Sequence, residues 1–124
     1  MLRALFAATA MTLTALPALA QPPVLIVFFP DWSGAIDNAA TRVIGQAAKL
    51  ASDNPSAPVT VTGYADNTGS RQANIYLSQL RAQRVIDGLV ADGISAGRLK
   101  LVAAGEQNQP GVASRRVEIA ITGQ

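Results

Sequence analysis

Residues 59–69 read Val-Thr-Val-Thr-Gly-Tyr-Ala-Asp-Asn-Thr-Gly, and this stretch decides the fold. Its first four residues alternate branched apolar and hydroxyl side chains, as a half-exposed strand does. Residues 63–69 are rich in turn formers, and apolar residues recur at helical spacing after Gly69. A strand that runs through a short loop into a helix is the building unit of α/β sheets, which gather ligands at such junctions.

Upstream of this stretch, the sequence predicts one strand and one helix. Residues 24–29 are apolar and rich in β-branched side chains without alternation, which predicts a strand buried on both sides or nearly so. A turn at residues 30–34 ends it. Apolar residues then recur at helical spacing from Ala35 to about Ser52, and a cluster of helix breakers at residues 53–58 leads into the next strand.

Downstream, Ser78 interrupts the helical pattern. Serine inside a helix competes for backbone hydrogen bonds, whereas at an N-cap it satisfies one. The sequence therefore predicts two helices: a short one over residues 70–77, and a longer one that Ser78 caps and Gly93 ends. Strands are expected at residues 98–103 and, with clean alternation, at residues 116–121.

This order of elements, βαβαβ followed by β, predicts an α/β fold. Strands joined through a helix favour a parallel arrangement with a right-handed crossover. We therefore expect a small mixed four-stranded sheet with the helices covering one face, an α/β sandwich.

The first twenty residues are typical of a secretory signal peptide. Arg3 precedes an apolar run at residues 4–19, and Ala18-Leu19-Ala20 is a small-x-small cleavage site. We expect residues 1–20 to be removed and residues 21–124 to form one exported domain. The alternative is a retained membrane anchor, which needs about 20 apolar residues. The chain has no cysteine to carry a lipid, and neither a lipid anchor nor a barrel is expected.

Composition excludes several classes of function. The absence of histidine and cysteine removes the commonest acid-base group, the commonest zinc ligands and the thiolate nucleophile. We therefore predict no catalysis, metal or cofactor, although Asp31 and Asp66 are a conceivable carboxylate pair. The net charge is only +2 and no basic run is interleaved with aromatics, so nucleic acid is not an expected partner.

The placement of charges suggests a small-molecule site. If Ser78 caps a helix, Arg81 lies in its first turn, where the helix dipole disfavours a cation by a few tenths to about 1 kcal/mol. A carboxylate bound between Arg81 and the helix end would remove that conflict. Asp66 supplies a negative charge and Asn74 can donate and accept, so the cleft suits a zwitterion. A plain turn with an exposed Asp66–Arg81 ion pair is the alternative, and contributes only about 0–1 kcal/mol.

The same residues carry a resemblance to a known family. The chain resembles the signature G-[HY]-[TS]-D-x-x-G…N-x-x-L-S-x-x-R-A-x-x-V of OmpA-like peptidoglycan-binding domains, the type found in OmpA, Pal and MotB. The matching residues are Gly63 to Gly69, Asn74, Leu77-Ser78, Arg81-Ala82 and Val85, then Gly93-Ile94, Gly105-Glu106 and Arg115 to Ile119. The resemblance therefore extends over nearly all of residues 21–124.

The resemblance implies a periplasmic protein, associated with the cell wall or outer membrane, whose cleft binds the meso-diaminopimelate of the peptidoglycan stem peptide noncovalently. Diaminopimelate is a zwitterion of the expected kind. By matching position, Asp66 is its binding acid and Arg81 the partner of its carboxylate. The other binding residues that the resemblance implies are Ala65, Asn67, Asn74, Arg115, Arg116, Asp31 and Trp32.

The chain departs from the family pattern in three places. Ala65 replaces a threonine or serine, Ser114 replaces an asparagine, and the loop at residues 107–113 is short. A second hypothesis is therefore an adaptor whose main partner is another envelope protein, bound at the exposed edge of the sheet, with weak wall binding. A third is a carboxylate-dependent wall hydrolase, which predicts the release of soluble wall fragments; we expect none.

Overall fold

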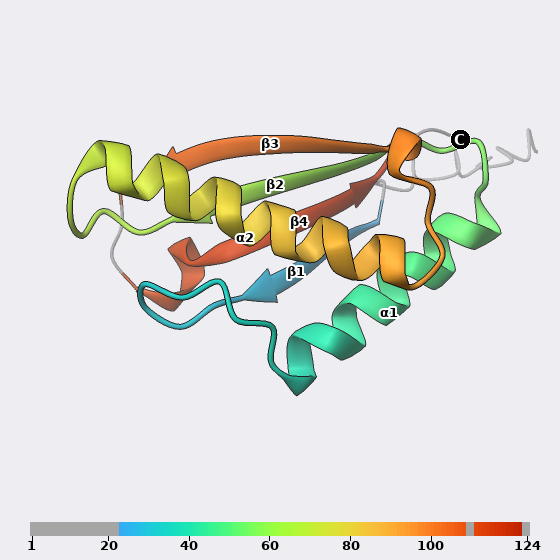
Figure 1. Ribbon diagram of the computed structural model, residues 1–124, viewed down its shortest axis with the longest axis horizontal. Helices are drawn as coiled ribbons and strands as arrows, with labels where there is room; N and C mark the ends of the chain where they lie inside the picture. Colours follow the sequence, from blue (N-terminus) through green and yellow to red (C-terminus); the bar gives the residue numbers. More distant parts are fainter. Residues whose placement is uncertain (1–22, 109–110, 123–124) are drawn as a thin grey trace, which may run out of the picture.

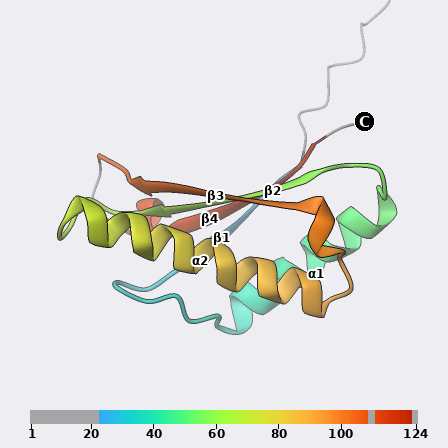
Figure 2. The same cartoon turned by 45° about the horizontal axis from the view of Figure 1, so that its top comes forward.

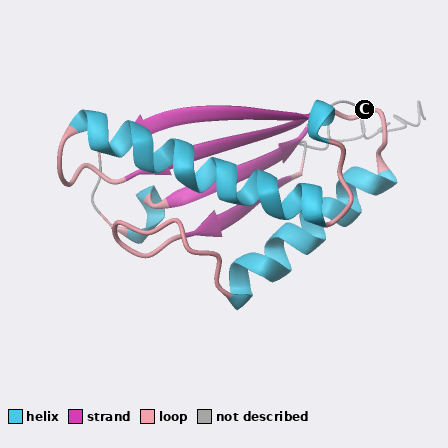
Figure 3. Cartoon of the chain, in the orientation of Figure 1, coloured by secondary structure: helices cyan, strands magenta, loops and turns pink. Residues whose placement is uncertain are grey.

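The computed structural model describes residues 23–108 and 111–122 of the chain. They form a four-stranded mixed sheet in the order β1-β4-β2-β3, with both long helices on one face (Figures 1, 2 and 3). The predicted α/β sandwich is confirmed. The predicted signal peptide lies outside the described residues. The elements are β1 (Val24–Phe28), α1 (Asn38–Asp53), β2 (Val59–Ala65), α2 (Arg71–Ala91), η1 (Ala96–Arg98), β3 (Leu99–Glu106), η2 (Val112–Ser114) and β4 (Arg116–Ile121).

Strand pairing brings three strand ends to one end of the sheet. β2 and β3, which α2 connects, are parallel, with Val61 opposite Leu101. β4 lies between β1 and β2 and is antiparallel to both. The carboxyl ends of β1, β2 and β3 therefore lie beside the beginning of β4, and the loops that leave them converge there.

The helices cover only one face of the sheet. Val59 and Val61 of β2 point toward the helices and are buried, as are Val117 and Ile119 of β4. On β1 only Val27 is buried, while the alternate residues Val24, Ile26 and Phe28 are exposed. The prediction that residues 24–29 are buried on both sides was wrong, because β1 is an edge strand of a sheet with one open face.

Helix α1 begins at a side-chain cap. The Asp37 carboxylate accepts a hydrogen bond from the Ala40 N–H at 2.7 Å, so α1 starts at Asn38 and not at Ala35 as predicted. Its buried face is mostly alanine, which lets the helix lie close to the sheet. Within the described residues, no helix has both the length and the apolar character needed to cross a membrane.

Residues 71–91 form one helix, so the prediction of two helices was wrong. Ser70 is the cap, with its Oγ accepting from the Ala73 N–H at 3.1 Å. Ser78 is fully buried in the helix interior, donating to the Ile75 carbonyl at 2.8 Å and accepting from the Gly105 N–H at 3.1 Å. Because the helix does not begin at Ser78, the dipole argument for Arg81 no longer applies.

Candidate ligand-binding site

Most of the predicted site residues lie where the loops converge, at the left end of the sheet in Figure 1. Three segments meet there: the β1–α1 loop, the β2–α2 loop and the start of β4. Asp66 is the first residue after β2, and it is 5% exposed. Its Oδ1 accepts from the Thr68 N–H at 3.1 Å and also from the Thr68 hydroxyl. These hydrogen bonds, together with Arg115, hold the pKa of Asp66 below its usual value, so the carboxylate is charged at neutral pH.

Arg115 connects the three segments. Its Nη1 lies 3.3 Å from Oδ2 of Asp66 and 3.0 Å from Oδ1 of Asp31. Its Nε donates to the Phe29 carbonyl at 3.1 Å. The Asp31 side chain is 68% exposed and that of Arg115 is 17% exposed. A guanidinium shared by two carboxylates therefore forms the solvent-accessible part of the site.

Arg81 lies beneath this cluster with no exposed surface. Its three nitrogens donate to the carbonyls of Ser33 (2.8 Å), Tyr64 (3.2 Å) and Pro30 (2.9 Å). Burial lowers the pKa of Arg81 to about 10, and the nearby Asp66 opposes that shift, so Arg81 stays charged at neutral pH. It joins the β1–α1 loop to the end of β2. Asp66 forms its ion pair with Arg115, and not with Arg81 as the alternative of a plain turn expected.

Asn74 is 1% exposed, and its amide orientation is fixed from two sides. Its Nδ2 donates to the Thr68 carbonyl at 2.9 Å and to Oε2 of Glu106 at 3.0 Å. The amide oxygen is then the atom that can accept from a ligand. Glu106 is a site residue to which sequence reasoning assigned no role. Its place in the family signature was the only signal for it.

The two adjacent arginines at the beginning of β4 have different surroundings: Arg115 is the last residue before the strand, and Arg116 is its first. Arg115 points into the cluster, whereas the Arg116 guanidinium lies 4.0 Å from the centroid of the Tyr64 ring and pairs with Glu118 at 3.0 Å. Tyr64 and Glu118 lie on the open face of the sheet, so the structure does not bring Arg116 to the other predicted site residues.

The remaining predicted residues differ in how far they face solvent. Ala65 is buried on the helix side of the sheet, while Asn67 is exposed on the β2–α2 loop. Trp32 is exposed, with its indole ring over Gly69. Of these three residues, Asn67 and Trp32 can contact a ligand at the surface.

Comparison with known proteins places the chain in a family. The sequence pattern described as "OmpA family" matches residues 28–120. This chain belongs to the OmpA family. It is 30% identical to the probable lipoprotein YiaD of Escherichia coli K12 over 104 residues, 77% of this chain and 48% of that protein. It is 37% identical to the peptidoglycan-binding protein ArfA of Mycobacterium tuberculosis over 88 residues, 64% of this chain and 27% of that protein. The chain thus spans less than half the length of each of these relatives.

Solved structures show the same fold. The peptidoglycan-associated lipoprotein of Burkholderia pseudomallei has a TM-score of 0.72 at 22% identity, over 79% of this chain and 90% of that one. A periplasmic domain of MotB from Helicobacter pylori has a TM-score of 0.70 at 25% identity, over 82% of this chain and 74% of that one. The OmpA-like fold expected from the signature is confirmed.

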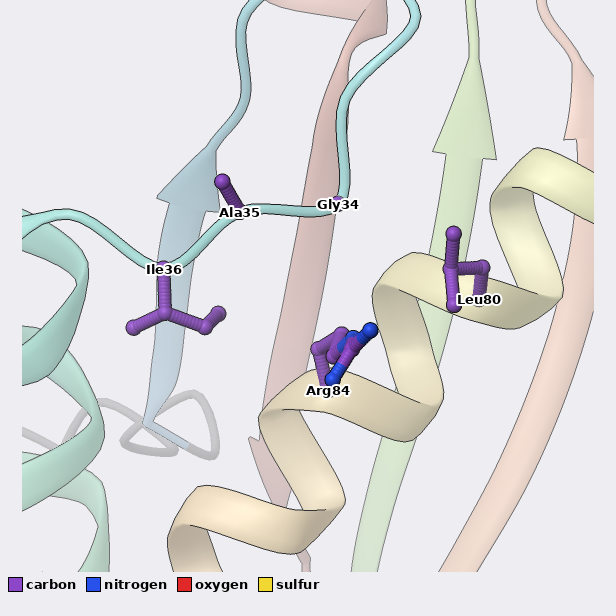
Figure 4. Close-up of a pocket in the computed structure, with 5 residues that line it drawn as sticks. All are labelled: Gly34, Ala35, Ile36, Leu80 and Arg84. Atoms are coloured by element: carbon purple, nitrogen blue, oxygen red, sulfur yellow. The ribbon is translucent and has the colours of Figure 1, made fainter.

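The cluster around Arg115 is separate from the neighbouring hollow shown in Figure 4. That hollow measures about 350 Å³ and lies between the β1–α1 loop and α2. Gly34, Ala35, Ile36, Leu80 and Arg84 line it, and it contains none of the predicted site residues. Within residues 23–108 and 111–122, no three acidic side chains are grouped so as to hold a metal ion.

Proposed function

We propose that this OmpA-family chain binds peptidoglycan noncovalently through the diaminopimelate of the stem peptide, as an exported periplasmic protein without catalytic activity. The observation that carries the proposal is the sharing of Arg115 Nη1 between Asp31 and Asp66, at 3.0 and 3.3 Å. The free end of diaminopimelate bears an ammonium and a carboxylate on one carbon. Each can meet an opposite charge in this cluster.

The described contacts suggest a role for each residue. Asp66 and the amide oxygen of Asn74 receive the ammonium, and Arg115 receives the carboxylate. Arg81 adds positive charge from below and holds the β1–α1 loop through the Pro30 and Ser33 carbonyls. Direct binding of the carboxylate by Arg81, as the signature implies, requires this side chain to leave its carbonyl acceptors.

Co-sedimentation with insoluble sacculi tests the proposal. The wild-type chain should sediment with diaminopimelate-type sacculi, and Asp66→Asn should bind at least tenfold more weakly, because a charged hydrogen bond contributes about 1.5–3 kcal/mol. Asp87→Asn is the matched control, since Asp87 is an exposed carboxylate on α2 outside the cluster. Equal sedimentation of both variants would sink the assignment. The sacculi should also release no soluble fragments over time.

One observation favours a second candidate function, an adaptor for another envelope protein. β1 is an edge strand, and Val24, Ile26 and Phe28 expose an apolar row on its open face. Such edges pair readily with another chain. Cross-linking in the periplasm should then recover one protein whether or not the wall has been digested, and Ile26→Lys should abolish that product. Loss of the product on wall digestion would refute the adaptor.

A further inference from the structure

Trp32 adopts an unfavourable backbone conformation beside the site. Its φ is +52°, and it is the only non-glycine residue with positive φ among the described residues. The left-handed region costs a residue with a Cβ roughly 1–2 kcal/mol. Strain of this kind persists only where the surroundings enforce it, and it gathers at ligand sites.

Folding energy does not account for this strain. The benzene part of the indole lies against Gly69, where an added Cβ would come within 2.3 Å of the ring. The side chain nevertheless remains 56% exposed. A tryptophan placed for stability would bury most of its large apolar surface. Here the backbone is strained to hold a largely exposed ring in one position.

That position is at the edge of the ionic cluster. The preceding residue, Asp31, pairs with Arg115, and the ring packs on the loop that begins at Asp66. Asp31, the residue before Trp32, has an exposed carboxylate, and the exposed Asn67 lies two residues before Gly69, on which the ring packs. The indole N–H donates to no described residue. Trp32 therefore offers a flat apolar face next to polar groups. The ion pair of Asp31 with Arg115 and the packing of the ring on Gly69 hold this face in place.

We propose that Trp32 is a stacking platform for an N-acetylated sugar of the glycan strand. A pyranose ring presents C–H groups on its faces and hydroxyl or acetamido groups at its edges. Dispersion favours the C–H face on the indole, and the polar neighbours suit the edges. The inference rests on the proposed function, because binding of the stem peptide at Asp66 is what brings the sugar, a short peptide stretch away, to Trp32.

Calorimetric titration with two ligands tests this assignment. One is a stem tripeptide that ends in diaminopimelate, and the other is the same tripeptide carrying its disaccharide. The wild-type chain should bind the sugar-bearing ligand about 2- to 10-fold more tightly, the range expected for one aromatic stacking contact. Because Trp32 is the only tryptophan of the chain, its fluorescence should change with the sugar-bearing ligand.

Variants separate this inference from the proposed function. Trp32→Gly removes the ring and the backbone strain together, so it should fold at least as stably as the wild type and should no longer bind the sugar-bearing ligand more tightly than the bare tripeptide. Asp66→Asn should lose both ligands. No gain from the sugar in the wild type, with Asp66 dependence intact, overturns the platform alone. If Trp32→Gly lowers the affinity for both ligands equally, the ring contacts the peptide and not the sugar, and the platform is again overturned. Unchanged binding by Asp66→Asn overturns the proposed function.

Discussion

Arg81 and Arg115 show how surroundings give the same residue type two different roles. Arg81 is enclosed and donates only to backbone carbonyls, so it acts on the position of the β1–α1 loop. Arg115 is partly exposed and pairs with two carboxylates. The signature includes both positions. Because Arg115 is partly exposed and Arg81 is buried, a ligand can contact Arg115 without any rearrangement of the site.

Replacement of Arg81 should reduce stability. Arg81→Ala removes a fully buried side chain and its three charge-assisted hydrogen bonds, so we expect a loss of about 3 kcal/mol or more in the free energy of unfolding. Arg81→Lys should recover little of it, because one ammonium cannot replace the planar fork of donors. Urea denaturation measures both. An Arg81→Ala variant as stable as Arg42→Ala, the exposed α1 control, would contradict this role.

Titration of Asp66 should change the stability of the protein only in acid. Hydrogen bonds from Thr68 and the charge of Arg115 lower the pKa of Asp66 below its ordinary value of 3.8. Since the folded state binds this proton more weakly than the unfolded state, the stabilisation is present above the unfolded pKa and disappears as pH falls through the folded pKa. The stability difference between wild type and Asp66→Asn should stay constant above about pH 5 and shrink below about pH 4. A difference that already changes between pH 6 and 7 would contradict the assignment.

At the scale of elements, the close contact between α2 and the sheet explains why sequence reasoning failed at Ser78. A Cβ on Gly63 of β2 would lie 1.9 Å from the Ser78 carbonyl oxygen, so helix and strand touch at these two residues. Only small side chains fit there. The Ser78 hydroxyl also satisfies the buried N–H of Gly105, next to the irregular pairing of β2 with β3. A serine with a tertiary partner looks in sequence like a serine that caps a helix.

Gly63→Ala should therefore be severely destabilising. The added methyl group meets backbone and not a flexible side chain, so α2 must shift, and we expect a loss of about 3 kcal/mol or more. Gly45→Ala on α1 is the control, because nothing lies within 4 Å of its Cβ position. That change should stabilise the helix by roughly 0.5–1 kcal/mol. Thermal unfolding of the two variants should shift in opposite directions, and a shared direction would refute the contact.

Ser78→Ala should cost about 1–2 kcal/mol, because it leaves the buried Gly105 N–H without an acceptor. The exposed Ser52→Ala on α1 should be nearly neutral. Hydrogen exchange at Gly105 gives a local measurement: its amide should exchange faster in Ser78→Ala than in wild type. Unchanged protection would show that the hydroxyl does not hold this N–H.

The elements that the sequence predicted correctly have local signals. Alternation identified residues 116–121, and helical spacing together with breakers identified α1 to within a few residues. What failed depends on tertiary neighbours: the exposure of Ile26 and Phe28 follows from the order of strands, which an apolar run does not encode. The contacts within the site also depend on tertiary neighbours. The signature named Asp66 and Asn74, but only the fold shows that Arg115 pairs with Asp66 and that Glu106 orients Asn74.

At the scale of the whole molecule, the sheet provides a rigid base and its loops carry the charges. The acids and arginines of the site come from the β1–α1 loop, the β2–α2 loop, α2, β3 and the residue before β4, so no single segment can form it alone. This convergence places the charged cluster at one end of a small domain that spans less than half the length of YiaD or ArfA.

The most direct test of the central claim compares two stem tripeptides that differ only in the third residue, meso-diaminopimelate or L-lysine. Both carry the ammonium, but only diaminopimelate carries the carboxylate assigned to Arg115. In calorimetric titration, the wild-type chain should bind the diaminopimelate peptide at least tenfold more tightly, a difference of about 1.4 kcal/mol or more. Arg115→Gln should remove most of that preference. Equal affinity of the wild-type chain for the two peptides would contradict the account.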